Sequence, residues 1–344
     1  MTFFSHDAGD RNHVERCSKP ARKGLARALL VATALLVTQM VAAAEGFPSA
    51  PIKLVVPFPP GGATDTIGRQ IAIEVAKHIG QAIVVENRPG AAGNVGVGSV
   101  TNAVADGYTL VLAANNQVAV DPVQEKLPFV PSRDLVAIAP LVSIPYIVVA
   151  NPSFPPNNIR ELLAAAAKEP GKINFASSGT GGPPHLASEL LMAQGGVVMT
   201  HIPYKGAVPA YTDVIGGQVQ FMTGDVNTAR PFLQSGRLKA LATTGRERLE
   251  QFPNVPTVAE SGLAGYEAEG WFGVFAPAKT PADVVAVLSK AFETAAQGPE
   301  FKKAMSALGG RIMVMSKPDF ARYIVSETTK RSNLIKSNKI ILEN

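Results

Sequence analysis

The chain has 344 residues, of which 46% are hydrophobic, 17% charged and 6% aromatic, with a single Cys and a formal net charge of +5. The length suggests two domains of about 150 residues each, and the apolar content excludes intrinsic disorder. One Cys can form neither an internal disulfide nor the four-ligand set of a structural zinc site. The sequence pI of 9.2 would suit a nucleic-acid surface only if the basic residues were clustered in the folded domain.

The first 44 residues have the pattern of a secretory signal peptide. Four basic residues, the last of them Arg27, precede an apolar stretch over 28–41 that ends in Ala42, Ala43 and Ala44. The stretch is shorter than the ~20 residues that a membrane-spanning helix needs, so a membrane anchor is the weaker alternative. We therefore predict export, with cleavage after Ala44.

Removing this leader changes the charge of the protein. Residues 1–44 hold six of the 32 basic residues, three of the 27 acidic residues, and Cys17. The other 300 residues carry 26 basic and 24 acidic residues, a net charge of +2, and no thiol. A nucleic-acid partner is therefore not expected. No cofactor or metal is expected either, because His78, His185 and His201 lack the spacing of metal ligands.

The first part of the mature chain alternates strands with helices. Strands are predicted over 52–58, 82–86 and 108–113, a helix over 67–79, and a Gly-rich loop entering a helix over 90–104. The helix prediction rests on apolar residues that recur at helical spacing, Ile67, Ile71, Val75 and Ile79. Such alternation predicts a parallel sheet with both faces covered.

The same pattern begins again after residue 150. Helices are predicted over 159–168, 185–194, 207–215 and 228–234, and strands over 173–176, 199–204, 219–223 and 238–243. The chain is then mostly helical, over 283–297, 300–308 and 318–336, and we expect this tail to pack on the first unit. Two stretches, 143–149 and 268–276, would connect the units. Two α/β lobes on either side of a cleft are typical of proteins that close on a ligand.

A Gly-rich loop lies between the first strand and the first helix. Glycine lets a ligand approach the backbone closely, and the first N–H groups of a helix favour a carboxylate or phosphate. Thr64 or Asp65 could cap the helix. No Lys-Ser/Thr follows the glycines, which excludes a nucleotide P-loop; a simple tight turn is the alternative. The candidate binding residues here are Phe58, Pro59, Gly61, Gly62, Ala63, Thr64 and Asp65.

A second loop of this kind precedes the helix over 185–194. It offers hydroxyl and N–H groups from Ser177, Ser178, Gly179 and Thr180, and we expect the two loops to hold the two ends of a short dicarboxylate. His185, at the helix start, could contact the ligand or only cap and pack. Two other residues, Trp271 and Lys205, could each have one of two roles. Trp271 could stack on a ligand or pack in the core, and Lys205 could pair with an anion or end a strand in solvent.

The sequence also contains a serine, a histidine and an acidic residue that could form the catalytic triad of a hydrolase. An exported hydrolase using Ser178, His185 and Asp225 is the alternative function. The G-x-S-x-G motif of a strained nucleophile is absent from the sequence, so we do not expect an enzyme.

Seven ordered segments carry a family resemblance: IKLVVPFPPGGATD at 52–65, VENRPGAAG at 85–93, DGYTL at 106–110, HIPYKG at 201–206, GRLKALA at 236–242, PNVPTVAESG at 253–262 and WFGVFAP at 271–277. They span nearly the whole mature chain, which resembles the Bug-type substrate-binding receptors of tripartite tricarboxylate transporters. The resemblance implies a periplasmic monomer with an α/β, two-lobed periplasmic-binding-protein fold of the type II-like, Venus flytrap kind. It also implies a small carboxylate ligand, namely a di- or tricarboxylate or an acidic amino acid, and membrane permease subunits as partners. A receptor that serves a sensor kinase would have the same sequence features.

The resemblance also divides the chain and assigns the pocket. Lobe 1 would combine 45–145 with 269–344, and lobe 2 would be 146–268. The pocket would take the two loops and His185, completed by Asn115, Tyr204, Lys205 and Asp225. Residues 224–227 depart from the usual family pattern. Asp225 could accept a hydrogen bond from a ligand amino group or cap the helix that follows.

Overall fold

The computed structural model describes residues 46–120 and 127–340. The predicted signal peptide and its cleavage point lie outside the described residues. The described residues from Phe47 onward form one compact unit. None of the helices in the described ranges is long and apolar enough to cross a membrane.

The strands are β1 (Ile52–Val56), β2 (Ile83–Asn87), β3 (Thr109–Ala114), β4 (Leu135–Ala150), β5 (Asn174–Ser177), β6 (Thr200–Pro203), β7 (Phe221–Asp225), β8 (Lys239–Thr243), β9 (Glu269–Pro277) and β10 (Arg311–Ile312). The α-helices are α2 (Ala63–Ile79), α3 (Asn94–Thr101), α4 (Asn115–Val118), α5 (Pro131–Asp134), α6 (Ile159–Lys168), α7 (Pro183–Gly195), α8 (Ala207–Ile215), α9 (Val226–Gln234), α10 (Ala282–Ala296), α11 (Pro299–Ala307) and α12 (Lys317–Ser337). A 3-10 turn, η1 (Ala91–Gly93), precedes α3.

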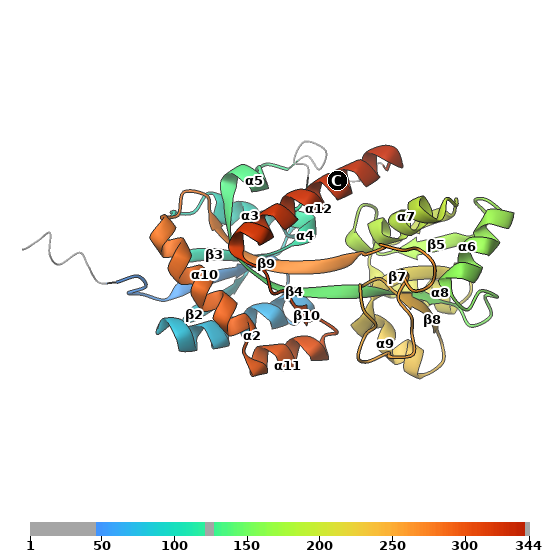
Figure 1. Ribbon diagram of the computed structural model, residues 1–344, viewed down its shortest axis with the longest axis horizontal. Coiled ribbons are helices and arrows are strands. Elements are labelled where there is room, and N and C mark those ends of the chain that lie inside the picture. Colours follow the sequence, from blue (N-terminus) through green and yellow to red (C-terminus); the bar gives the residue numbers. More distant parts are fainter. Residues whose placement is uncertain (1–45, 121–126, 341–344) are drawn as a thin grey trace, which may run out of the picture. The chain divides into compact units, whose positions relative to one another are not determined.

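The strands form two groups that share β4 (Figure 1). The first group has the order β2-β1-β3-β9-β4, and the second continues β4-β7-β5-β6, while β10 and β8 also pair with β4. The first part of β4 pairs with β9 as far as Pro145, and its last part, from Tyr146, pairs with β7. The long strand therefore belongs to both groups.

The strands that alternate with helices pair in parallel, as expected, but the whole sheet is mixed. Strands β1, β2 and β3 are parallel, as are β5, β6 and β7, but β4 and β9 are antiparallel to each other and to their other neighbours. The reason is the path of the chain: β4 takes it from the first strand group to the second, and β9 brings it back. Both connecting stretches predicted from the sequence, 143–149 and 268–276, fall on these two strands.

Helices cover both faces of each strand group. In the first group, apolar residues of α2, α10 and α11 form one core cluster with the sheet, and α3 and α12 contribute to a second cluster. In the second group, α6 and α7 supply one cluster and α8 and α9 the other. The helical tail thus packs on the first group, as expected. The division into lobes, 45–145 with 269–344 and 146–268, stays a prediction.

Local sequence explains the helix that matters most for the site. Ile67, Ile71 and Val75 of α2 are completely buried, so one apolar stripe faces the sheet. Gly80 ends the helix in the left-handed conformation, with φ of 73°. The helix begins at Ala63, four residues before the first of the periodic apolar residues, so its N-terminus lies within the Gly-rich loop.

Candidate functional site

A cavity of about 600 Å³ lies where the ends of several elements meet. It is large enough for a small organic ligand, since ligand pockets have volumes of about 300–1,000 Å³. The elements that line it are the β1–α2 loop, the β3–α4 junction, β4, the start of α7, the β7–α9 junction and β9. Eight of the predicted site residues line this cavity: Phe58, Gly61, Gly62, Ala63, Thr64, Asn115, Ser178 and Asp225.

The N-terminus of α2 opens onto the cavity. Gly62 is the N-cap residue, and Thr66 donates the first intrahelical hydrogen bond to its carbonyl oxygen, at 3.0 Å. The N–H groups of Ala63 and Thr64 come before that bond and have no acceptor within the helix. Both residues line the cavity. Two backbone donors and the positive end of the helix dipole therefore lie at the cavity wall, where they favour a carboxylate.

Asp65 holds this loop in shape and does not line the cavity. Its buried carboxylate accepts hydrogen bonds from the Gly61 N–H at 3.0 Å, from Asn87 Nδ2 at 2.9 Å and from Arg69 Nε at 2.9 Å. The Arg69 guanidinium, and after it the Gly61 and Asn87 donors, lower the pKa of Asp65 to about 2, against the opposing effect of burial. Asn87 also donates to the Phe58 carbonyl oxygen. Pro59 lies in the same loop, exposed and outside the cavity.

The second loop reaches the cavity differently from the first. Its helix, α7, starts with Pro183 and Pro184, which line the cavity but carry no N–H. Other N–H groups of the loop are used internally, because that of Gly179 donates to Ser177 Oγ and that of Gly181 donates to His185 Nδ1. Thr180 and Gly179 do not line the cavity. This loop therefore offers the exposed Ser178 and an apolar proline wall, and not a second matching set of helix N–H groups.

Ser177, His185 and His201 form a buried cluster beneath that loop. Ser177 Oγ lies 2.6 Å from His201 Nε2, and the two imidazole rings stack with centroids 3.8 Å apart. Burial, and then the neighbouring His185, lower the pKa of His201 to about 4, so the ring is neutral near pH 7. Ser177 and His185 are 1% and 2% exposed. The cluster supports the loop from below and does not meet the cavity.

The hydrolase alternative fails on this geometry. His185 Nδ1 accepts from the Gly181 N–H at 2.9 Å, and its Nε2 lies 3.3 Å from Glu189 Oε1. Because Nδ1 accepts a hydrogen bond, the neutral ring carries its proton on Nε2, so the buried His185 has no free lone pair to take a proton from Ser178, which lies on the cavity side of the loop.

Tyr204, Lys205 and Trp271 lie away from the cavity. The Tyr204 hydroxyl donates to Asp213 Oδ2 at 2.7 Å, and burial, followed by that carboxylate, raises the pKa of Tyr204 to about 12. Lys205 is exposed at the end of β6, and the structure shows no ion pair for it within the described residues. Trp271 is fully buried and packs edge-to-face on Phe320 of α12, at 5.5 Å between ring centroids. The core reading is therefore correct for Trp271.

The junction of β7 and α9 supplies the wall of the cavity from the second strand group. Asp225, Val226, Asn227 and Thr228 line it. Asp225 is the N-cap residue of α9 but makes no side-chain capping hydrogen bond. Burial raises the pKa of its carboxyl above the usual range, although the side chain remains open to solvent in the cavity.

Side chains of the second strand group also cap the C-terminus of α11. Asn227 Nδ2 donates to the Leu308 carbonyl oxygen at 3.0 Å, and Arg230 Nη2 donates to that of Ala307 at 3.3 Å and to Asn227 Oδ1 at 2.8 Å. Gln251 Nε2 donates to the Ser306 carbonyl oxygen at 2.7 Å. Asn227 thus contacts both the cavity and this helix end, and Leu308 also lines the cavity.

Sequence reasoning missed the residues that β4 and β9 bring to the cavity. These are Ile144, Tyr146, Gly270 and Phe272. Tyr146 stands opposite Asp225 in the β4–β7 pairing, and a Cβ on Gly270 would lie 2.6 Å from the Tyr146 hydroxyl oxygen, so the glycine gives room to this ring. No local motif marks these positions. The one available signal was that they lie in the two stretches predicted to connect the lobes.

The charge of the cavity wall is unusual for an anion site. Of the described residues that line it, none is Lys, Arg or His, and Asp225 is the one acid. In the described ranges no group of three or more His, Cys, Asp or Glu side chains could hold a metal ion. A negatively charged ligand would thus be held by backbone N–H, amide and hydroxyl groups.

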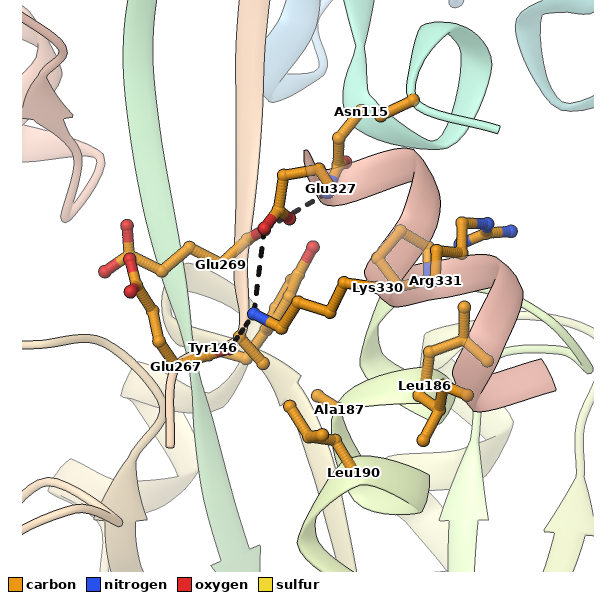
Figure 2. Close-up of a pocket in the computed structure, with 14 residues that line it drawn as sticks. Asn115, Tyr146, Leu186, Ala187, Leu190, Glu267, Glu269, Glu327, Lys330 and Arg331 are labelled. Carbon is orange, nitrogen blue, oxygen red and sulfur yellow. Dashed lines mark hydrogen bonds and ion pairs between the residues drawn. The ribbon is translucent and has the colours of Figure 1, made fainter. Parts of the chain in front are cut away.

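A smaller pocket of about 80 Å³ adjoins the cavity and shares Asn115, Tyr146 and Pro183 with it (Figure 2). Lys330 of α12 points into it, with Nζ 2.9 Å from the Glu267 carbonyl oxygen and 3.7 Å from Glu327 Oε1. Arg331, which also lines the pocket, donates to the Gly181 carbonyl oxygen at 3.1 Å. The volume leaves room for a few water molecules only, and both cations already have partners. The larger cavity is therefore the candidate ligand site.

Comparisons with known proteins give the family. Residues 67–340 match the sequence model of the tripartite tricarboxylate transporter family receptor. Protein BugT of Bordetella pertussis is 33% identical over 312 residues, which cover 89% of this chain and 95% of BugT.

Three solved structures share the fold. The chain resembles Rpa4515 of R. palustris with adipate, with a TM-score of 0.73, 28% identity, and coverage of 87% of this chain and 100% of that one. It resembles periplasmic binding protein BugD, with a TM-score of 0.70, 32% identity, and coverage of 86% and 100%. It also resembles MatC of Rhodopseudomonas palustris with bound malate, with a TM-score of 0.68, 31% identity, and coverage of 84% and 100%.

These similarities confirm the predicted α/β, two-lobed periplasmic-binding-protein fold, and they place the protein among receptors and not among enzymes. Together with the cavity, they show that the chain belongs to the receptor family of the tripartite tricarboxylate transporters.

Proposed function

We propose that this receptor binds a small carboxylate in the 600 Å³ cavity and delivers it to the membrane subunits of a tripartite tricarboxylate transporter. It acts in the periplasm as a monomer after removal of residues 1–44. The leader pattern supports the location, and BugD, a similar structure, is described as a periplasmic binding protein. Adipate and malate, the ligands in two similar structures, support the class of ligand.

The observation that carries the proposal is the N-terminus of α2 at the cavity wall. The N–H groups of Ala63 and Thr64 are free for a ligand, and the Asp65 carboxylate and Asn87 fix the loop around them. Donors fixed in advance lose little entropy when a ligand arrives. A carboxylate accepts two such hydrogen bonds, each worth about 1.5–3 kcal/mol because one partner is charged.

A thermal-shift screen tests the proposal. The purified protein is heated with C4–C6 di- and tricarboxylates, and with sugars, neutral amino acids and phosphate esters as other solute classes. A ligand that binds the folded state stabilises it by about 2.7 kcal/mol at 100 times its Kd, and we expect this for at least one carboxylate. Stabilisation by another class, with none by any carboxylate, would contradict the proposal. Native mass spectrometry of the protein as purified would show directly which solute it carries.

A further inference from the structure

Asp225 is an acidic residue without an ion-pair partner among the described residues, and it lies in the cavity proposed to bind a carboxylate. It lines the cavity, yet within the described residues its carboxylate has no ion pair and no hydrogen bond to another residue. The sequence left open whether it caps α9, and the structure shows no capping hydrogen bond. An unpaired carboxylate at the wall of an anion site would repel the ligand unless the ligand supplies a positive charge.

The position of Asp225 is fixed by its surroundings. It ends β7, where it pairs with Tyr146 of β4, and its carbonyl oxygen accepts a hydrogen bond from the Tyr211 hydroxyl at 3.2 Å. The preceding Gly224 makes this contact possible, because a Cβ there would lie 2.2 Å from the Tyr211 oxygen. Strand pairing and packing therefore hold the backbone of Asp225 at this wall, from which its exposed side chain meets the cavity.

In the part of the chain that the structure describes, no cation is paired with Asp225. The cavity wall has no Lys, Arg or His among the described residues, and Arg230, one helical turn further along α9, donates to Asn227 and Ala307 instead. The Asp225 side chain is exposed to the cavity. A ligand that brings its own cation there would supply the opposite charge that the described cavity wall does not offer.

We propose that Asp225 selects, among small carboxylates, those that also carry an ammonium group, with the ligand carboxylate at the start of α2 and its ammonium group at Asp225. This inference rests on the proposed carboxylate function. The two groups would be held from different strand groups, since α2 follows β1 and Asp225 ends β7. An amino dicarboxylate would leave its second carboxylate to Ser178, Asn115 or Asn227, which also line the cavity.

Calorimetry with matched ligand pairs tests the inference. Each pair has the same carbon chain with and without an amino group: aspartate and succinate, glutamate and glutarate, 2-aminoadipate and adipate. For the native protein we expect the amino member of the best-binding pair to bind at least tenfold more tightly. In Asp225→Asn that ratio should fall to about one, mainly because the plain dicarboxylate binds better once the repelling charge is gone. Asp283→Asn, which removes an acid from the first turn of α10, is the matched control and should leave the ratio unchanged.

The outcomes separate the two proposals. If plain dicarboxylates bind as well as their amino partners, and Asp225→Asn changes neither, Asp225 does not select the ligand although the carboxylate function stands. If no member of any pair binds while another solute class does, the carboxylate function and this inference both fall. Thermal denaturation shows whether Asp225→Asn is folded. If it is not, Asp225→Ser takes its place, since serine is also a favoured N-cap residue.

Discussion

Replacing Gly62 with valine tests whether the start of α2 holds the ligand. Gly62 has φ of −82° and ψ of 174°, a conformation open to any residue, and the atom nearest to an added Cβ is the Pro59 carbonyl oxygen at 3.9 Å. The fold should therefore accept the change. Valine is a poorer N-cap than glycine but restricts the unfolded chain, and these opposing effects leave the free energy of unfolding within about 1 kcal/mol.

Binding should respond far more strongly than stability. Gly62 lines the cavity beside the free N–H groups of Ala63 and Thr64, and an isopropyl group there would keep a carboxylate from reaching them. The loss of two charge-assisted hydrogen bonds amounts to about 3–6 kcal/mol, which weakens binding by more than about 100-fold. Gly62→Ala, with a smaller side chain, should lie between the native protein and Gly62→Val.

Isothermal titration calorimetry with the best ligand of the screen measures the effect, and thermal denaturation checks the fold. Gly216→Val is the control: Gly216 is the C-cap residue of α8, has φ of −74° and does not line the cavity. We expect native affinity from the control. A folded Gly62→Val protein that binds with native affinity would refute the placement of the carboxylate at α2.

Two further predictions concern stability. Asp65→Asn should destabilise the protein at pH 5 by about 1–2 kcal/mol. The pKa of Asp65 is about 2, against 3.8 for the free group, and this difference corresponds to at most about 2.4 kcal/mol. The expected value is smaller because the partner Arg69 is half exposed and solvent screens the pair. This contribution is present above pH 3.8 and disappears as the pH falls towards 2, so urea titrations of native and variant protein should converge at low pH; a constant difference would show that Asp65 does not act through its charge. Trp271→Ala should cost about 3–5 kcal/mol by leaving a cavity against Phe320, measured by circular dichroism during urea unfolding, with ligand affinity unchanged under native conditions. A cost below about 1 kcal/mol would contradict the core role of Trp271.

Local elements of this fold could be predicted well because their signals are local. Helix α6 and helix α8 have the predicted boundaries, 159–168 and 207–215. The apolar stripe of Ile67, Ile71 and Val75 predicted α2 apart from its first residues. The Gly-rich loop that was predicted before this helix lines the cavity. These features depend on residues within a few positions of each other, so the sequence pattern contains them.

The parts that could not be predicted depend on distant pairing. The antiparallel pairing of β4 with β9 runs from Leu135 opposite Pro277 to Pro145 opposite Glu269. These residues are far apart in sequence, and the alternation of strands and helices gives no sign of their pairing. Tyr146 and Phe272 reach the cavity only through that pairing. The equivalence expected for the two loops failed for a local reason, because Pro183 and Pro184 remove the N–H groups that α2 offers at the same place.

The capping of α11 has a consequence for how the two strand groups can separate. Asn227 and Arg230 donate to the carbonyl oxygens of Leu308 and Ala307, and Gln251 donates to that of Ser306, which also accepts from the Gly309 N–H. Parting them would exchange each hydrogen bond for one to water, at a net cost of about 0.5–1.5 kcal/mol each. The contacts that join the two strand groups at this helix end are therefore polar, and each hydrogen bond can be replaced by one to water.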